Sequence, residues 1–267
     1  MANTKSIVLQ ETANNLNTLL KAKAKALPKG FNETRFLQNC MTVLQDTRNI
    51  EKCDSVSVAR TMLKGAFLGL DFFSKECYAI PYNDYKTGKS HLEFQTDYKG
   101  ERKLMKQYSV RPIKDIYAKV VREGDDFEEI IEKGIPTINF RPKPFSNEKI
   151  IGVFAVVLFE DGGLLYETMS AEDVEKIKVG FAKRDKEGNY SKAWTTTPEE
   201  MYKKTVIRRL RKSVELEFDS IEQQKTYEEA SEFDVRKDEE VKEEASPFEN
   251  VDFEEVEERD ESEVKQE

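Results

Sequence analysis

The residues Ile150–Phe159 constrain the fold of this chain more than any other stretch. They are nearly all β-branched or aromatic, a composition that favours a buried strand. Asp161–Gly163 then supplies turn residues, and Leu164–Met169 has the pattern of a return strand. We therefore expect an antiparallel sheet that contains this hairpin.

Other segments extend the β structure. Cys77–Tyr82 and His91–Gln95 predict a second hairpin, and Thr87-Gly88 marks its turn. Three further runs are strand-like, namely Ile113–Arg122, Phe127–Ile131 and Thr137–Arg141. Proline limits the pairing of the last run, because it cannot donate a hydrogen bond to a neighbouring strand.

Helical patterns precede and follow these strands. Residues 1–30 predict a helix or a mobile arm, and Asn32 can cap a helix that runs to about Thr47. Further helices are expected from Ser55 or Ser57 to near Gly69, from 97 to 108 and from 170 to 180, the last with a capping pattern at Ser170. This order predicts an α+β fold, with helices packed on a small antiparallel sheet.

The final predicted helix covers residues 198–213. Thr197 is the expected N-cap, Pro198 takes the first position, and Glu200 completes a capping box. A buried stripe is expected at four-residue steps, made of Tyr202, Val206, Leu210 and Val214.

Charge is distributed unevenly along the chain. The net charge is −9, but residues 221–267 hold 20 acidic and 6 basic residues, whereas residues 1–220 hold 32 acidic and 37 basic residues. A mildly basic body with an acidic end is a recognised hint of nucleic-acid interaction. We predict an arm or helix at 1–30, a core at 31–220 and an acidic, disordered tail at 221–267.

The composition argues against several other classes of protein. Cys40, Cys53 and Cys77 form no close pair, and with the single His91 they give no zinc-binding spacing. Such cysteine usage suggests a reducing cytoplasm. We find no signal-peptide pattern and no apolar run of the roughly 20 residues that a membrane span needs. We therefore expect a soluble protein of the cytoplasm.

The last helix is the first candidate binding surface. This helix carries a row of cations. Such a row can bind a chain of phosphates, because each phosphate that is neutralised releases counterions. Trp194 and Tyr190 lie just before it and could stack on unpaired bases, although an aromatic residue there could instead anchor a loop. The cations are Lys203, Lys204, Arg208, Arg209, Arg211 and Lys212, preceded by Lys183, Arg184, Lys186 and Lys192.

The second candidate surface lies where a predicted strand meets a helix, at Gln95–Lys103. Free N–H groups at a helix start favour an anion, and Thr96 or Asp97 can cap this one. Lys99, Arg102 and Lys103 project from its first turns, while Arg111, Lys114 and Lys119 could line a sheet edge. Taken alone, ordinary surface lysines on a capped helix explain this pattern better.

Catalytic motifs fit the sequence poorly. Gly88-Lys89-Ser90 resembles the end of a phosphate-binding loop, but Asn83 stands where that motif needs glycine, so no ATP site is expected. A single histidine also supports no convincing catalytic triad. A metal-dependent nuclease stays an alternative, with acids that match its usual spacing poorly, namely Asp71, Glu76, Glu93 and Asp97.

Three stretches resemble the RecT family of phage single-strand annealing proteins, which are relatives of the phage lambda Beta protein. They are Ala59–Pro81, which includes Leu70-Asp71-Phe72-Phe73-Ser74-Lys75-Glu76, then Phe94–Gly100, and Trp194–Arg209. The resemblance covers about residues 30–215 and leaves out the acidic tail.

The resemblance implies a protein that binds single-stranded DNA and holds a new duplex in a narrow basic groove of a helical filament or ring. Annealing by base pairing would need no ATP, and no motif requires Mg²⁺ or another cofactor. A phage 5′–3′ exonuclease and a host single-strand-binding protein are the implied partners, and no membrane is implied. The motif match makes Lys99, Arg102, Lys103, Lys203, Lys204 and Arg208 the leading groove residues, with Thr96, Tyr98 and Trp194 in support. A plain single-strand-binding protein without annealing activity, the nuclease and an interaction scaffold that uses the tail stay open as alternatives.

Overall fold

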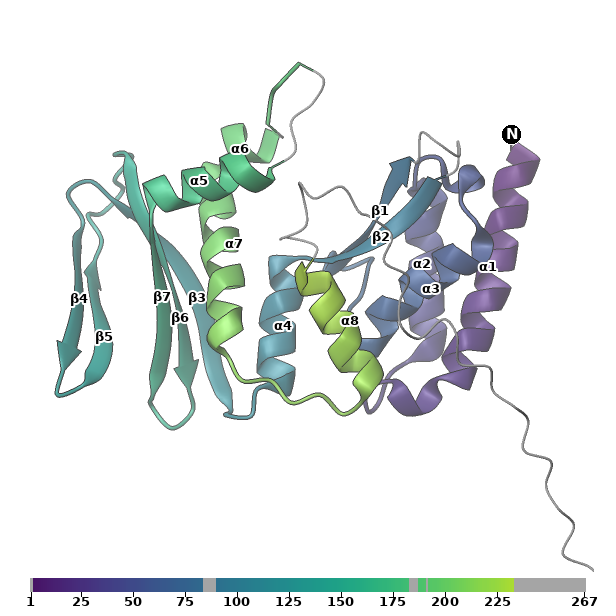
Figure 1. The fold of residues 1–267 in the computed structure, drawn as a ribbon, viewed down its shortest axis with the longest axis horizontal. Helices are drawn as coiled ribbons and strands as arrows, with labels where there is room; N and C mark the ends of the chain where they lie inside the picture. Colours follow the sequence, from purple (N-terminus) through teal and green to yellow (C-terminus); the bar gives the residue numbers. More distant parts are fainter. Residues whose placement is uncertain (1, 84–89, 183–186, 191, 233–267) are drawn as a thin grey trace, which may run out of the picture. The chain divides into compact units, whose positions relative to one another are not determined.

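The computed structural model describes residues 2–83, 90–182, 187–190 and 192–232 (Figure 1). The chain divides into two units, 1–235 and 236–267, and all the described residues belong to the first. The predicted turn at Thr87-Gly88 and the part of the predicted tail beyond residue 232 lie outside the described residues.

A three-stranded antiparallel sheet forms one half of the first unit. Its order is β3 (Ile113–Arg122), β6 (Ile150–Phe159), β7 (Leu164–Ser170), so the strand that is most apolar in sequence lies in the centre. Two helices, α5 (Ala171–Phe181) and α7 (Pro198–Leu210), cover one face of this sheet (Figure 1). Because β6 is covered on both faces, it lacks the polar alternation of a strand with one solvated face.

A separate hairpin covers the other face of this sheet. It consists of β4 (Asp126–Glu132) and β5 (Ile135–Arg141), and its aromatic side chains meet Phe154 of β6. Ring centroids of Phe127 and Phe140 lie 5.4 and 5.0 Å from that of Phe154. A two-stranded hairpin is marginal on its own, and this packing supplies the contacts it needs.

The other half of the unit is a group of helices behind a two-stranded sheet. The helices are α1 (Ala2–Ala22), α2 (Glu33–Asp46) and α3 (Ser55–Phe67), and the strands are β1 (Cys77–Asn83) and β2 (Ser90–Thr96). Leu16 and Leu20 of α1 are buried in this core, so the N-terminal segment is a packed helix and not a mobile arm. Short 3-10 turns lie at Ala24–Ala26 and Ile50–Lys52.

Local capping follows the sequence in part. Asn32 caps α2 and Ser170 caps α5, each accepting a bond from the backbone N–H three residues on, as predicted. Helix α3 begins at Ser55, one of the two predicted starts, and Asp54 caps it. The capping box at Thr197 is wrong, because its hydroxyl donates to the Ala193 carbonyl in a short helix, α6 (Lys192–Thr196), where the sequence predicted a loop.

The segment after α7 also differs from the prediction. Residues 211–213 form a 3-10 turn, and α8 (Ile221–Glu232) follows, although disorder was expected from Ile221. Gln223 of α8 is fully buried and donates to the Ala26 carbonyl at 3.1 Å. The body of the protein therefore extends to at least residue 232, because α8 belongs to its core.

Candidate nucleic-acid interface

The junction of β2 with α4 (Tyr98–Tyr108) is buried and tightly packed. Thr96 and Asp97 are only 2% and 8% exposed, and the Asp97 N–H donates to the Glu76 carbonyl at 2.9 Å. A Cβ on Gly100 would lie 2.2 Å from the Glu76 carbonyl oxygen, so only glycine allows this approach. The motif Asp97-Tyr98-Lys99-Gly100 is thus fixed by the close approach of α4 to the loop before β1.

Helix α7 contacts this junction from the other half of the unit. Its apolar stripe, Tyr202, Val206 and Leu210, is buried on the sheet as predicted. Lys204 Nζ consequently reaches Asp97 Oδ1 at 3.7 Å, and Arg208 Nη2 donates to the Thr96 carbonyl at 3.3 Å. Residues more than 100 positions apart in sequence are brought together. We call Thr96, Asp97, Lys99, Lys204 and Arg208 the corner.

Arg211 does not lie on the open surface with these residues. Its side chain is 3% exposed and forms an ion pair with Glu101, whose side chain is 1% exposed. The Thr96 hydroxyl donates to the same Glu101 oxygen, and the Tyr227 ring of α8 lies 5.5 Å from Arg211 Cζ. The prediction that Arg211 binds DNA therefore conflicts with its burial. The cause is local, because α7 ends at Leu210 and the following 3-10 turn directs Arg211 inward.

Exposed groups at the corner can contact a nucleic acid. Lys99 is exposed and forms no ion pair with any residue that the structure describes. Tyr98 is half-buried, and Tyr78 of β1 is 39% exposed. Pairing of Cys77 with Thr96 and of Tyr78 with Gln95 puts this tyrosine on the strand next to the corner. Burial and then the carboxylate of nearby Asp97 raise the pKa of Tyr78. We did not predict Tyr78 as a site residue, because only pairing of β1 with β2 brings it there.

Arg102 and Lys103 lie on other sides of α4 and serve its packing. Arg102 lies 3.7 Å from Asp115 of β3. Lys103 Nζ lies 2.7 Å from both Glu76 Oε2 and the Gly69 carbonyl. Each of these two side chains is thus engaged by a carboxylate outside α7. The structure therefore does not place them with Lys204 and Arg208.

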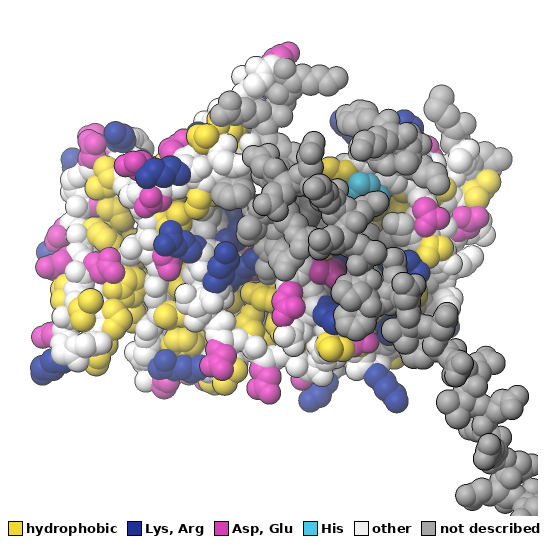
Figure 2. Space-filling model, viewed as in Figure 1, with side chains coloured by type: hydrophobic (Ala, Val, Ile, Leu, Met, Phe, Trp, Pro, Cys, Tyr) yellow, Lys and Arg dark blue, Asp and Glu magenta, His cyan; other side chains and the backbone are white. Residues whose placement is uncertain are grey.

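The other predicted site residues are dispersed. Arg209 pairs with Glu167 at 2.8 Å and Lys203 with Glu200 at 2.9 Å. Arg111 contacts both carboxylate oxygens of Asp161 at 2.6 and 2.5 Å. Figure 2 shows Lys and Arg side chains over α7 in this view. Lys114, Lys119 and Lys192 are exposed, and Arg184 lies outside the described residues.

Trp194 is packed more than it is presented. It is half-buried against the core beneath α7, and Lys178 Nζ lies 5.4 Å from its ring centroid. The same ammonium group lies 5.0 Å from the Tyr190 ring. These contacts favour the interpretation of Trp194 as a loop anchor.

The acids considered for a nuclease are engaged by their own neighbours. Asp71 accepts from Asn39 at 2.7 Å, Glu76 pairs with Lys103, and Glu93 lies 3.2 Å from His91. Within the described residues, no group of three His, Cys, Asp or Glu side chains is placed to hold a metal ion. In the same residues no helix is both long and apolar enough to cross a bilayer.

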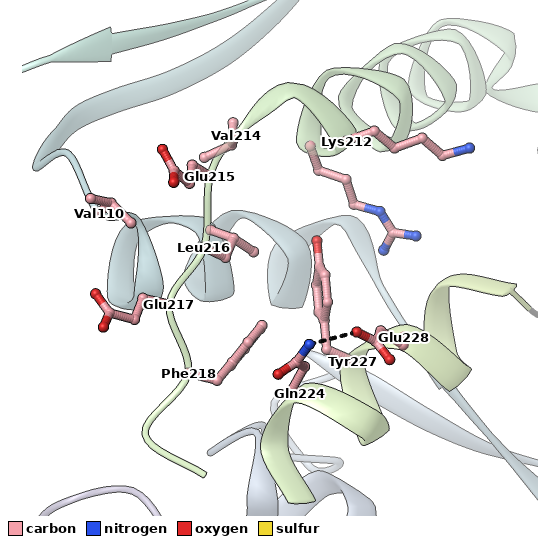
Figure 3. A pocket seen from close by; sticks show the side chains of 11 residues that line it. Val110, Lys212, Val214, Glu215, Leu216, Glu217, Phe218, Gln224, Tyr227 and Glu228 are labelled. Atoms are coloured by element: carbon pink, nitrogen blue, oxygen red, sulfur yellow. Dashed lines mark hydrogen bonds between the residues drawn. The ribbon is translucent and has the colours of Figure 1, made fainter. Parts of the chain in front are cut away.

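A cavity of about 850 Å³ lies behind Arg211, between α8 and the segment that leads to it (Figure 3). Val214, Leu216, Phe218 and Tyr227 give it an apolar lining, and Glu215, Glu217 and Glu228 also line it. The Phe218 and Tyr227 ring centroids are 5.1 Å apart. Three carboxylates repel a phosphate chain, so this cavity suits DNA less well than the corner does.

Two comparisons with known proteins bear on the family of this chain. The model of the RecT family matches residues 34–247. The chain is 30% identical over 192 residues to the protein RecT of Escherichia coli strain K12, covering 70% of this chain and 68% of that protein. The matched range contains the corner and both helices that form it.

Proposed function

The chain belongs to the RecT family, and from this premise we propose that it binds single-stranded DNA and anneals it to a complementary strand without ATP. Membership implies DNA binding and single-strand annealing in DNA recombination. In this proposal the two strands meet at the corner.

One observation carries the proposal. Two cations of α7, Lys204 and Arg208, reach Asp97 and the Thr96 carbonyl at the start of α4. The exposed Lys99 follows two residues later, and Tyr78 and Tyr98 flank the same strand-to-helix junction in strand pairing and in sequence. Cations bind the phosphates of the DNA backbone whatever the base sequence, and aromatic faces stack on any base. An annealing surface needs both properties, since it must act on any sequence and leave base edges free to pair.

The electrostatics of annealing explain what such a surface contributes. Two polyanions repel each other, and fixed cations reduce that repulsion while base pairing supplies the driving free energy. Nucleotide hydrolysis is therefore unnecessary, and no step in this scheme requires Mg²⁺. A head-to-tail assembly of subunits would align successive corners into a groove, as a filament or a ring. A phage 5′–3′ exonuclease that produces the single strands and a host single-strand-binding protein are the partners we propose.

A charge-removal experiment tests the assignment. In the Lys204→Gln/Arg208→Gln variant, amide donors replace the cations. If each cation binds one phosphate of a single strand, losing both reduces the salt slope by about 1.4 and weakens binding about 25-fold at 0.1 M salt. Annealing of complementary oligonucleotides should slow in parallel. The variant Lys176→Gln/Lys225→Gln removes the same charge from α5 and α8 and serves as the matched control.

Two results would count against the proposal. Unchanged DNA binding in the corner variant, with the fold intact by circular dichroism, would remove the corner from the interface. Strand coating without faster annealing by the unmodified protein would favour the plain single-strand-binding alternative.

A further inference from the structure

A second surface with DNA-binding chemistry lies on the far side of α4, around a cavity of about 350 Å³. It lies between the start of α2 and the loop that connects α3 to β1. Its volume is at the lower end of the range for ligand pockets, roughly 300–1,000 Å³. We call the cavity, together with residues 69–76, the Phe73 site.

The loop at this site is held rigidly by Asp71. One oxygen of Asp71 accepts from the Phe73 N–H at 2.9 Å, and the other accepts from Asn39 at 2.7 Å and Ser74 at 3.3 Å. The Asp71 N–H donates to Glu76 Oε2 at 2.9 Å, and Lys75 takes a left-handed conformation with φ of 57°. A loop with this many bonds holds its side chains in fixed positions.

Two adjacent phenylalanines in this loop have opposite environments. Phe72 is 3% exposed, and its ring centroid lies 6.2 Å from Phe36 and 6.0 Å from Phe94. Phe73 is 58% exposed. Burial of Phe72 in the aromatic cluster fixes the loop so that its neighbour faces solvent. Phe31 and Phe36 line the cavity as well.

The charges at the site are of two kinds. The two carboxylates that line the cavity are already compensated, Glu76 by Lys103 and Asp71 by its three donors. Lys29 and Arg35, which also line it, and Lys75 in the loop are exposed and have no ion-pair partner among the described residues. The positive charges of these three side chains are therefore available, and they favour an anionic ligand.

We propose that the Phe73 site is a second contact for single-stranded DNA, in which the Phe73 ring stacks on a base. Lys29, Arg35 and Lys75 bind the flanking phosphates. Phe73 is exposed two residues before Lys75, on the loop that borders the cavity lined by Lys29 and Arg35. Aromatic rings and cations together are the groups that bind unpaired strands. Lys99 of the corner lies one turn before Lys103, about 6 Å along α4, and Lys103 lines the cavity. One strand can thus follow α4 from the corner to Phe73. This inference rests on the proposed function.

A single-tryptophan reporter tests the stacking contact. The chain has one tryptophan, so Trp194→Phe/Phe73→Trp places the only indole at the site. Titration with an oligo(dT) strand should quench its fluorescence. The control Trp194→Phe/Phe145→Trp places the indole at a fully exposed phenylalanine between β5 and β6, and it should not be quenched. An unquenched indole at position 73, on a strand that anisotropy shows to be bound, would overturn the inference.

A second variant avoids any dependence on Trp194. Because Phe73 is 58% exposed, Phe73→Ala should leave the fold intact. Its Kd for oligo(dT) should weaken about 5-fold or more, as expected for loss of one stacked base, whereas Phe145→Ala should not change it. An equal Kd for Phe73→Ala and the unmodified protein would overturn the inference. So would equal quenching of the indole at position 73 by free dTMP, since the ligand would then be a nucleotide and not a strand.

The outcomes separate this inference from the proposed function. If the corner variant loses DNA binding while both Phe73 variants bind like the unmodified protein, the corner assignment stands and the Phe73 site fails. If the DNA-free protein loses self-association in Phe73→Ala, Phe73 is a contact between copies of the chain, and the proposal of a DNA contact fails.

Discussion

Replacing Arg211 with methionine distinguishes a buried structural cation from a DNA contact. Arg211 lies in the basic run that the sequence assigns to DNA, yet its side chain is 3% exposed and paired with Glu101. We expect Arg211→Met to reduce the free energy of unfolding strongly. Any loss of DNA binding in this variant should follow from loss of the folded corner.

The size of the effect follows from what the substitution leaves behind. Glu101 is fully buried, and its Oε2 has no hydrogen-bond partner among the described residues. Without Arg211, the Thr96 hydroxyl still donates to Oε1, but the charge of Glu101 loses its ion pair and the contact with Tyr227 is lost too. Breaking a buried pair from one side costs about 3–5 kcal/mol, because an unpaired buried charge remains.

Urea denaturation followed by circular dichroism measures this cost. The double variant Glu101→Leu/Arg211→Met removes both charges and should be more stable than Arg211→Met alone, although the Thr96 hydroxyl then lacks its partner at a cost of about 1–3 kcal/mol. Arg211→Met with stability within about 1 kcal/mol of the unmodified protein, but with clearly weaker DNA binding, would refute this reasoning and return Arg211 to the interface.

Three further outcomes are expected. Gly100→Ala should lower the free energy of unfolding by about 1–3 kcal/mol or more, since its Cβ would meet the Glu76 carbonyl, and a thermal melt equal to that of the unmodified protein would contradict this. Deleting residues 233–267, which hold 16 acidic and 5 basic residues, should leave DNA binding intact or tighter. Deleting residues 222–267 should lower the melting temperature, because this deletion also removes α8 from the core. Equal melting temperatures for the two deletions would be evidence against this role of α8. Burial raises the pKa of the thiols of Cys40, Cys53 and Cys77, that of Cys53 to about 11. A disulfide reagent at pH 8 should therefore label the native protein far more slowly than the urea-unfolded protein. Equal labelling rates would show that the thiols are accessible.

The elements that could be predicted from the sequence are those with local causes. The apolar run Ile150–Phe159 became β6 with the predicted bounds, and Asn32 and Ser170 cap their helices. Thr197 failed as a cap because α6, a short helix of weak pattern, offered its hydroxyl a nearby carbonyl. For α8 the glutamate-rich composition predicted disorder. The residues Gln223, Thr226 and Ala230 are nevertheless buried at helical spacing.

The candidate site was predictable only as two separate surfaces. Sequence periodicity placed Lys204 and Arg208 on one face of α7, and the strand-to-helix pattern marked Thr96 and Asp97. Their meeting depends on packing between the two halves of the unit, which no local pattern encodes. The family resemblance suggested that both stretches serve one groove, yet it also included Arg102 and Lys103, which the fold uses as partners of Asp115 and Glu76. The basic run of the last helix likewise included Arg211, which is the partner of Glu101.

This division of the cations bears on how a strand can be held and still anneal. Seven of the predicted DNA-binding cations form ion pairs with carboxylates of the fold, so a phosphate must compete for them. The exposed pairs among these are worth little in either direction. On our proposal each subunit would then hold a strand weakly, at the corner and at Phe73. Weak contacts repeated along an assembly give high total affinity while each single contact can open. A mispaired segment can therefore be released and tested again, which one tight site per subunit would prevent.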